Sequence, residues 1–71
     1  MEINTGLAYR RMAEKHGQTQ RQVAGICAVS AQTANRWFMR KNQSIALASD
    51  NCKKLGWDFL EFMEYATGRK S

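Results

Sequence analysis

The sequence predicts an all-α domain in which five short helices surround a single core. Apolar residues recur every three or four positions between the breaks in the chain, and no segment alternates as a strand does. The chain contains no proline, so nothing interrupts a helix from within. Its 71 residues are 44% hydrophobic, which suits one small core and is too apolar for a disordered tail. Residues 1–71 are therefore expected to form one domain.

The first helix is predicted over about residues 5–16. Thr5 can cap it, because its hydroxyl can accept a hydrogen bond from an unpaired N–H group of the first turn. Gly17 follows, and glycine readily adopts the left-handed conformation that ends many helices. The stripe expected to face the core consists of Leu7, Ala8, Met12 and Ala13.

The second and third helices are predicted within about residues 19–41, on either side of a short turn. Thr19, followed three positions later by Gln22, has the form of a capping box. Val29 is expected to fill the turn, and Ser30 to cap the third helix. The inward faces should consist of Val23, Ala24, Ile26 and Cys27 in the second helix, and of Ala31, Ala34, Trp37 and Phe38 in the third.

The fourth and fifth helices are predicted within about residues 44–67, where they complete the core. Gly56 ends the fourth helix, and Asp58 caps the fifth with Glu61 as its capping-box partner. The inward residues should be Ile45, Ala48, Cys52 and Leu55 in the fourth helix, and Phe59, Phe62, Met63 and Ala66 in the fifth.

Positive charge is concentrated in the first three-fifths of the chain. The net charge is +5, with seven Lys or Arg against two Glu in residues 1–43 and four of each sign in residues 44–71. No acidic residue occurs from Gln18 to Ser49. A small basic chain of this kind favours a polyanionic partner, both by attraction and by counterion release.

Several functional classes are disfavoured. Cys27 and Cys52 are isolated, and only His16 could join them, so we expect no metal site and no cofactor. The sequence lacks paired carboxylates in its basic part, a glycine-rich phosphate loop and a nucleophile partnered by histidine. We therefore do not expect an enzyme or a small-molecule ligand. The sequence shows no export signal or apolar run of about 18 residues, so we expect a cytoplasmic protein that does not insert into a membrane.

Two helices separated by a turn of about three residues have the spacing of a helix-turn-helix. Ala24 allows the two helices to approach closely, and Ala34 and Trp37 anchor the third helix to the core. The opposite face of the third helix is polar or basic. It is therefore free of repulsion toward phosphate.

The whole chain resembles the Cro and lambda-repressor type of helix-turn-helix domain found in phage regulators. The order of five helices agrees with that family, as do Gln20, Ala24, Val29, Ser30, Ala34 and Trp37. The stretch 35–37 with its following basic turn is also similar to the lambda CII activator. Ala28 departs from the pattern, because the family usually has glycine there. An alanine implies a right-handed turn conformation or mild strain.

The resemblance implies a lambda-repressor-like fold that binds double-stranded DNA, with the third helix in the major groove. Gln32 could pair with adenine and Arg36 with guanine, while Ala31 could only contact a thymine methyl group. The base-reading residues would be Ala31, Gln32, Asn35 and Arg36. Gln20 resembles the family's phosphate-binding glutamine. The further backbone contacts would be Thr33, Arg40, Lys41 and Gln43.

The predicted function is thus a sequence-specific transcriptional regulator, of the phage or prophage repressor type. The alternative is a protein-interaction module that uses the same fold to bind a protein partner. Met39 leaves both possibilities open: it could fold over Phe38 or the fourth helix, or contact a thymine methyl or sugar.

A homodimer is also expected, because one module of this size reads only about half a site. The neutral C-terminal part supplies apolar residues outside the predicted core stripes. The candidates for this interface are Leu47, Trp57, Leu60 and Tyr65.

Overall fold

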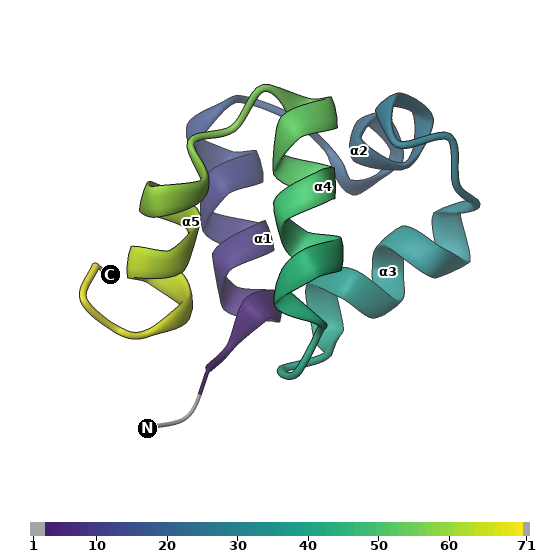
Figure 1. The fold of residues 1–71 in the computed structure, drawn as a ribbon. Coiled ribbons are helices and arrows are strands. Elements are labelled where there is room, and N and C mark those ends of the chain that lie inside the picture. Colours follow the sequence, from purple (N-terminus) through teal and green to yellow (C-terminus); the bar gives the residue numbers. More distant parts are fainter. Residues whose placement is uncertain (1–2, 71) are drawn as a thin grey trace.

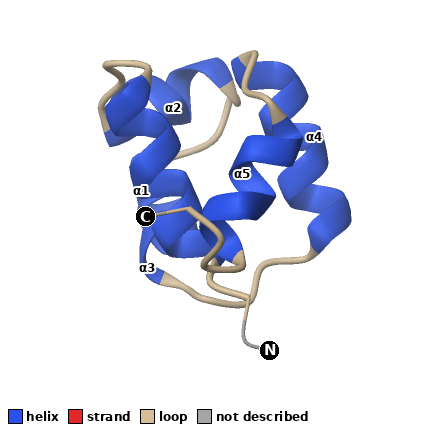
Figure 2. Ribbon diagram, turned by 90° about the vertical axis from the view of Figure 1, so that its left-hand side faces the viewer, coloured by secondary structure: helices blue, strands red, loops and turns tan. Residues whose placement is uncertain are grey.

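The computed structural model describes residues 3–70. This part of the chain forms five helices joined by loops and contains no strand (Figure 1; Figure 2). The helices are α1 (Thr5–Lys15), α2 (Gln20–Ile26), α3 (Ala31–Met39), α4 (Ile45–Leu55) and α5 (Phe59–Ala66). The predicted all-α, five-helix fold is therefore confirmed. Within residues 3–70 no helix has the length and apolar content to cross a membrane.

Tyr9 of α1 lies at the centre of the core and is completely buried. Its ring stacks on Trp37 and Phe38 of α3, with centroids 5.8 Å away in both cases. The edge of Phe62 in α5 approaches the same ring at 5.0 Å. The predicted stripe of α1 omitted Tyr9, although this residue joins α1 to both α3 and α5.

Four residues differ from their predicted environments. Ile26, Ala31 and Ile45 were expected to face the core, but each lies at the end of a helix and is exposed. Trp57 was expected at a dimer surface, but it is buried between the helices. Its indole N–H donates to Oε1 of Gln18 over 2.8 Å. Trp57 thus completes the monomer's own core, and its interface assignment was wrong.

The capping predictions hold for α2 and α3, and in part for α5. Both hydrogen bonds of the capping box between Thr19 and Gln22 are present. Asp58 caps α5 by accepting from the Leu60 N–H, but Glu61 turns away toward two lysines instead of closing a box. The N-cap of α1 is Asn4, whose side chain accepts from the Leu7 N–H.

Thr5, which we expected to cap α1, instead fastens α1 to the end of α3. Its hydroxyl donates to the Lys41 carbonyl over 3.2 Å and accepts from the Gln43 N–H over 3.1 Å. The next residue, Gly6, lies against the same backbone: a Cβ there would be 2.6 Å from the Arg40 carbonyl oxygen. Only glycine permits this approach. The first turn of α1 therefore sets where α3 ends and how residues 40–43 leave it.

Candidate nucleic-acid interface

α2 and α3 form a helix-turn-helix at one side of the molecule, where α2 crosses α3 steeply (Figure 1). Ala24 and Ala34, the two small residues expected between the helices, are both buried. The turn is closed by a hydrogen bond of 3.0 Å from the Val29 N–H to the Ala24 carbonyl. Ala28 takes the left-handed conformation, with φ +57°. The strain foreseen for alanine in this turn is thus present, because its Cβ crowds the backbone there.

The outward side of α3 is made entirely of exposed residues. We call this surface the α3 face; it consists of Ala31, Gln32, Asn35, Arg36, Met39 and Arg40. The opposite side is held by Ala34 and Phe38, which are buried. At the start of the helix, the Ser30 hydroxyl accepts from the Thr33 N–H over 3.2 Å. The α3 face is therefore presented by a helix that is capped at its start and anchored along its back.

The four predicted base-reading residues lie together. They line one open depression of about 490 Å³, and Gln20 at the start of α2 completes it. The lining residues are Gln20, Ala31, Gln32, Asn35 and Arg36. The structure thus brings a residue from α2 to the same hollow as the first two turns of α3. The depression contains amide and guanidinium groups but no carboxylate.

Within residues 3–70, the cations at the end of α3 form no ion pair. Arg36, Arg40 and Lys41 are exposed, and none contacts a carboxylate among residues 3–70. The ion pairs of this part of the chain involve Glu14 or Glu61 instead. The positive charge beside the α3 face is therefore available to a ligand.

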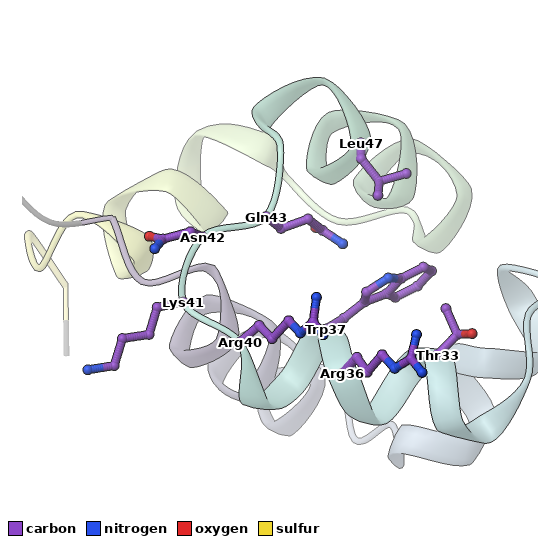
Figure 3. Close-up of a pocket in the computed structure, with 8 residues that line it drawn as sticks. All are labelled: Thr33, Arg36, Trp37, Arg40, Lys41, Asn42, Gln43 and Leu47. Atoms are coloured by element: carbon purple, nitrogen blue, oxygen red, sulfur yellow. The ribbon is translucent and has the colours of Figure 1, made fainter.

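A second groove lies between α3 and the start of α4 (Figure 3). It encloses about 470 Å³ and contains Arg36 and the remaining predicted backbone contacts, together with the interface candidate Leu47 and two residues that the sequence had not assigned to a site, Trp37 and Asn42. The lining residues are Thr33, Arg36, Trp37, Arg40, Lys41, Asn42, Gln43 and Leu47. Trp37 had been assigned only to the core, but its half-buried ring also forms the floor of this groove. Arg36 lines both this groove and the depression beside Gln20, and so connects them.

A chain of hydrogen bonds fixes the Gln43 side chain at this groove. Nδ2 of Asn51 donates to the Tyr9 hydroxyl over 2.9 Å, and that hydroxyl donates to Oε1 of Gln43. Burial raises the pKa of Tyr9 to about 12, so the hydroxyl keeps its proton. Because the Tyr9 hydroxyl donates its proton to Oε1 of Gln43, the amide nitrogen of Gln43 points away from Tyr9. That Nε2 atom is buried, and among residues 3–70 it has no hydrogen-bond partner.

The other predicted positions differ in their exposure. Met39 is 66% exposed, so its side chain projects from the α3 face and does not fill the core. Among the interface candidates, Leu60 is 73% and Leu47 43% exposed, whereas Tyr65 is half-buried. Leu47 of α4 lines the groove beside α3, whereas Leu60 and Tyr65 both belong to α5.

The thiols and other metal-ligand residues do not form a site in the described range. Cys27 and Cys52 are both buried and free, and burial raises the pKa of each, that of Cys52 to about 12. From residue 3 to residue 70, no group of three His, Cys, Asp or Glu side chains is placed to hold a metal ion.

No protein-family model, curated protein or solved structure matches this chain. The likeness to Cro-type domains therefore rests on the residues quoted from the sequence, and the function rests on the chemistry of the α3 face.

Proposed function

We propose that this protein binds double-stranded DNA in a sequence-specific manner, with α3 in the major groove, and acts as a transcriptional regulator. The observation that carries the proposal is the grouping of Gln20, Ala31, Gln32, Asn35 and Arg36 in one exposed, acid-free hollow. An α-helix fits the major groove, where each base pair presents its own pattern of donors and acceptors.

The polar residues of the α3 face have the chemistry that base reading requires. A glutamine amide offers a donor and an acceptor together and can pair with adenine, which suits Gln32. The guanidinium of Arg36 can donate two hydrogen bonds to O6 and N7 of guanine. Each good bidentate pair is worth about 1–3 kcal/mol of discrimination against the wrong base. Met39, exposed on the same face, offers an apolar contact for a thymine methyl group.

Cations beside the α3 face would supply the contacts to phosphate. Arg40 and Lys41 follow the helix directly, and Arg36 lies one turn earlier. Because no described carboxylate pairs with them, they can neutralise phosphates without first breaking an ion pair. Such contacts position a protein on the duplex and contribute most of the sequence-independent affinity.

The finer assignments follow from this role. The protein would act in the cytoplasm as a phage-type repressor, and it would pair on two half-sites one helical turn apart. Leu60, the most exposed large apolar residue of the described chain, is the leading candidate for the contact between two copies. Two copies on neighbouring half-sites would double the length of sequence that α3 can read.

Fluorescence anisotropy of a labelled, random-sequence duplex of about 20 base pairs tests DNA binding directly. The affinity should fall steeply between about 50 and 200 mM salt, because bound cations displace counterions from the phosphates. An absence of binding at 50 mM salt would reject the proposal.

Binding to a protein partner is the second candidate, and the exposure of Met39 within the α3 face favours it. Under this alternative, binding of the protein partner would depend on Met39, and the labelled duplex would not bind at 50 mM salt. The anisotropy experiment therefore separates the two candidates without knowledge of the partner.

A further inference from the structure

We propose that the groove between α3 and α4 binds a small planar aromatic anion, either a carboxylate or a phosphate monoester, and that this ligand displaces DNA from α3. The first part stands on the groove alone. The second part, the displacement, rests on the proposed DNA-binding function. The sequence had led us to expect no small-molecule ligand.

The groove has the size and lining of a ligand site. Its volume of about 470 Å³ lies within the range of small-molecule pockets, which is roughly 300–1,000 Å³. Trp37 and Leu47 supply apolar surface on opposite sides of the opening (Figure 3). Such pockets combine apolar walls with a few convergent polar groups that orient the ligand. The polar groups here come from α3 and from the turn that follows it.

Gln43 provides a hydrogen-bond donor that the protein leaves unused. Its Nε2 atom is buried without a partner among residues 3–70, and its side chain lines the groove together with Trp37 (Figure 3). A buried donor without an acceptor is destabilising, so an acceptor at this position would be bound favourably. Nε2 is covered from solvent, and the ligand therefore reaches it only after an exposed lining side chain, such as that of Arg40 or Leu47, rotates aside.

The orientation of this amide is determined by its neighbours. If Oε1 and Nε2 of Gln43 exchanged places, the Tyr9 hydroxyl would face two donors, because Asn51 already donates to it. The hydroxyl proton would then have no acceptor. Gln43 therefore presents an N–H group to the groove and not a carbonyl, which favours a ligand with a hydrogen-bond acceptor at this position.

Charge selects an anion among the possible acceptors. Arg36, Arg40 and Lys41 line the groove, and no acidic side chain among residues 3–70 does. Guanidinium groups bind carboxylate and phosphate by paired, charge-assisted hydrogen bonds. The half-buried ring of Trp37 offers an aromatic surface to the remainder of the ligand. These features together specify a planar aromatic group that carries one anionic substituent.

Arg36 connects the groove to the α3 face. It lines both the ligand groove and the base-reading depression. A ligand that held its guanidinium in the groove would remove it from a base edge and would also neutralise charge beside the helix. We therefore expect ligand and DNA to exclude one another.

The test uses 2-naphthoate as the probe and NMR spectroscopy of the ¹⁵N-labelled full chain without DNA. The side-chain amide signals of Gln43 and the indole N–H signal of Trp37 should shift and saturate as 2-naphthoate is added. Trp57 is an internal reference, because its indole N–H is engaged by Gln18 away from the groove. Uncharged 2-naphthalenemethanol should bind at least about tenfold more weakly, since it cannot pair with the guanidinium groups.

Two substitutions locate the site. Gln43→Glu keeps an acceptor for Tyr9 but replaces the donor by a second oxygen, and it should weaken 2-naphthoate binding about tenfold or more. Leu47→Glu places a carboxylate at the exposed rim, and it should weaken binding without touching the Tyr9 chain. Ile26→Glu is the matched control, because Ile26 has a similar exposed fraction, 47% against 43%, and lies outside the groove.

The outcomes are distinct. Equal shifts at Trp37 and Trp57, equal affinity for the neutral analogue, or equal losses in Leu47→Glu and Ile26→Glu would each overturn the ligand site. If 2-naphthoate binds but leaves the anisotropy of a bound duplex unchanged, the displacement is wrong and the site stands. If no duplex binds at all, the proposed function fails while the NMR result still decides the site.

Discussion

The basic side chains beside α1 and α5 differ from those of α3 in their partners: within residues 3–70, Lys15 and Lys70 form ion pairs, whereas the arginines of α3 form none. Glu61 of α5 is only 11% exposed in its side chain, and it accepts hydrogen bonds from Lys15 at 2.5 Å and from Lys70 at 2.9 Å. By contrast, Arg36 and Arg40 of α3 contact no carboxylate in the described chain. Glu61 therefore joins α5 to α1, whereas α3 contains no acidic residue.

We therefore expect the side of α1 and α5 and the side of α3 to respond to mutation in different ways. Substitutions where α1 meets α3 or α5 should change the stability of the fold. Substitutions on the α3 face should change binding and leave stability nearly untouched, since exposed side chains away from special features usually contribute within about 0.5 kcal/mol.

The largest expected effect on stability is that of Gly6→Ala. The added Cβ would lie 2.6 Å from the Arg40 carbonyl and 2.8 Å from the Phe38 carbonyl, both of which are backbone atoms. Relieving this overlap should cost about 2–3 kcal/mol in the free energy of unfolding, measured with urea. Gly25→Ala in α2 is the control, because no described atom outside its chain neighbours and its own helix backbone lies within 4 Å of its Cβ position. It should stabilise by about 0.5–1 kcal/mol, and equal effects in the two variants would refute the close contact.

Arg36→Ala should have the converse effect: weaker DNA binding with almost unchanged stability. Loss of a bidentate base contact should reduce the affinity for the preferred sequence by about 1–3 kcal/mol, that is, by roughly tenfold to a hundredfold. Anisotropy titrations at fixed salt measure this change. Arg69→Ala removes the same charge from the C-terminal side, and it should have little effect. If both variants lose affinity equally, only net charge matters and α3 does not read bases.

Ala28→Gly should stabilise the turn between α2 and α3. Ala28 adopts φ +57°, a conformation that is unfavourable for alanine by about 1–2 kcal/mol and open to glycine. Part of this gain is offset by the greater entropy of glycine in the unfolded chain, so we expect a net gain of about 0.5–1 kcal/mol in urea unfolding. Ala46→Gly, at an exposed position within α4, should instead destabilise by up to about 1 kcal/mol. A loss of stability in Ala28→Gly would show that the turn is not left-handed.

The smallest expected effect is a dependence of stability on pH through Glu61. Hydrogen bonds from Lys15 and Lys70 lower the pKa of this carboxyl from 4.5 to about 2. Its contribution is therefore fully present above pH 4.5 and is lost as the pH falls toward 2. The difference in urea midpoint between the wild type and Glu61→Gln should shrink over this interval. A difference that stays constant from pH 6 to pH 2 would show that the pair of lysines does not hold Glu61 ionised.

The sequence predicted the helices well because their signals are local. The breaks at Gly17 and Gly56 are left-handed as expected, and the caps Thr19, Ser30 and Asp58 each accept the backbone N–H that their positions require. The acid-free stretch and the polar side of α3 likewise predicted which surface would remain open.

Features that depend on contacts between distant segments were not predictable in the same way. Thr5 has a side chain typical of a helix cap, yet its hydroxyl forms hydrogen bonds with the backbone of residues 41 and 43. These residues come close to Thr5 only in the folded chain. Trp57 stands in a linker, so nothing local indicated that Gln18 would accept its N–H. The groove beside α3 was missed for the same reason, because it forms only where α4 folds back over Trp37.

The most direct test of the central claim, that α3 reads base edges, is the selection of bound sequences from a random DNA pool with the wild type and with Gln32→Ala. The account predicts an enriched motif for the wild type, arranged as two half-sites about one helical turn apart, and a loss of preference at defined positions in the variant. No enrichment, or the same motif for both proteins, would contradict it.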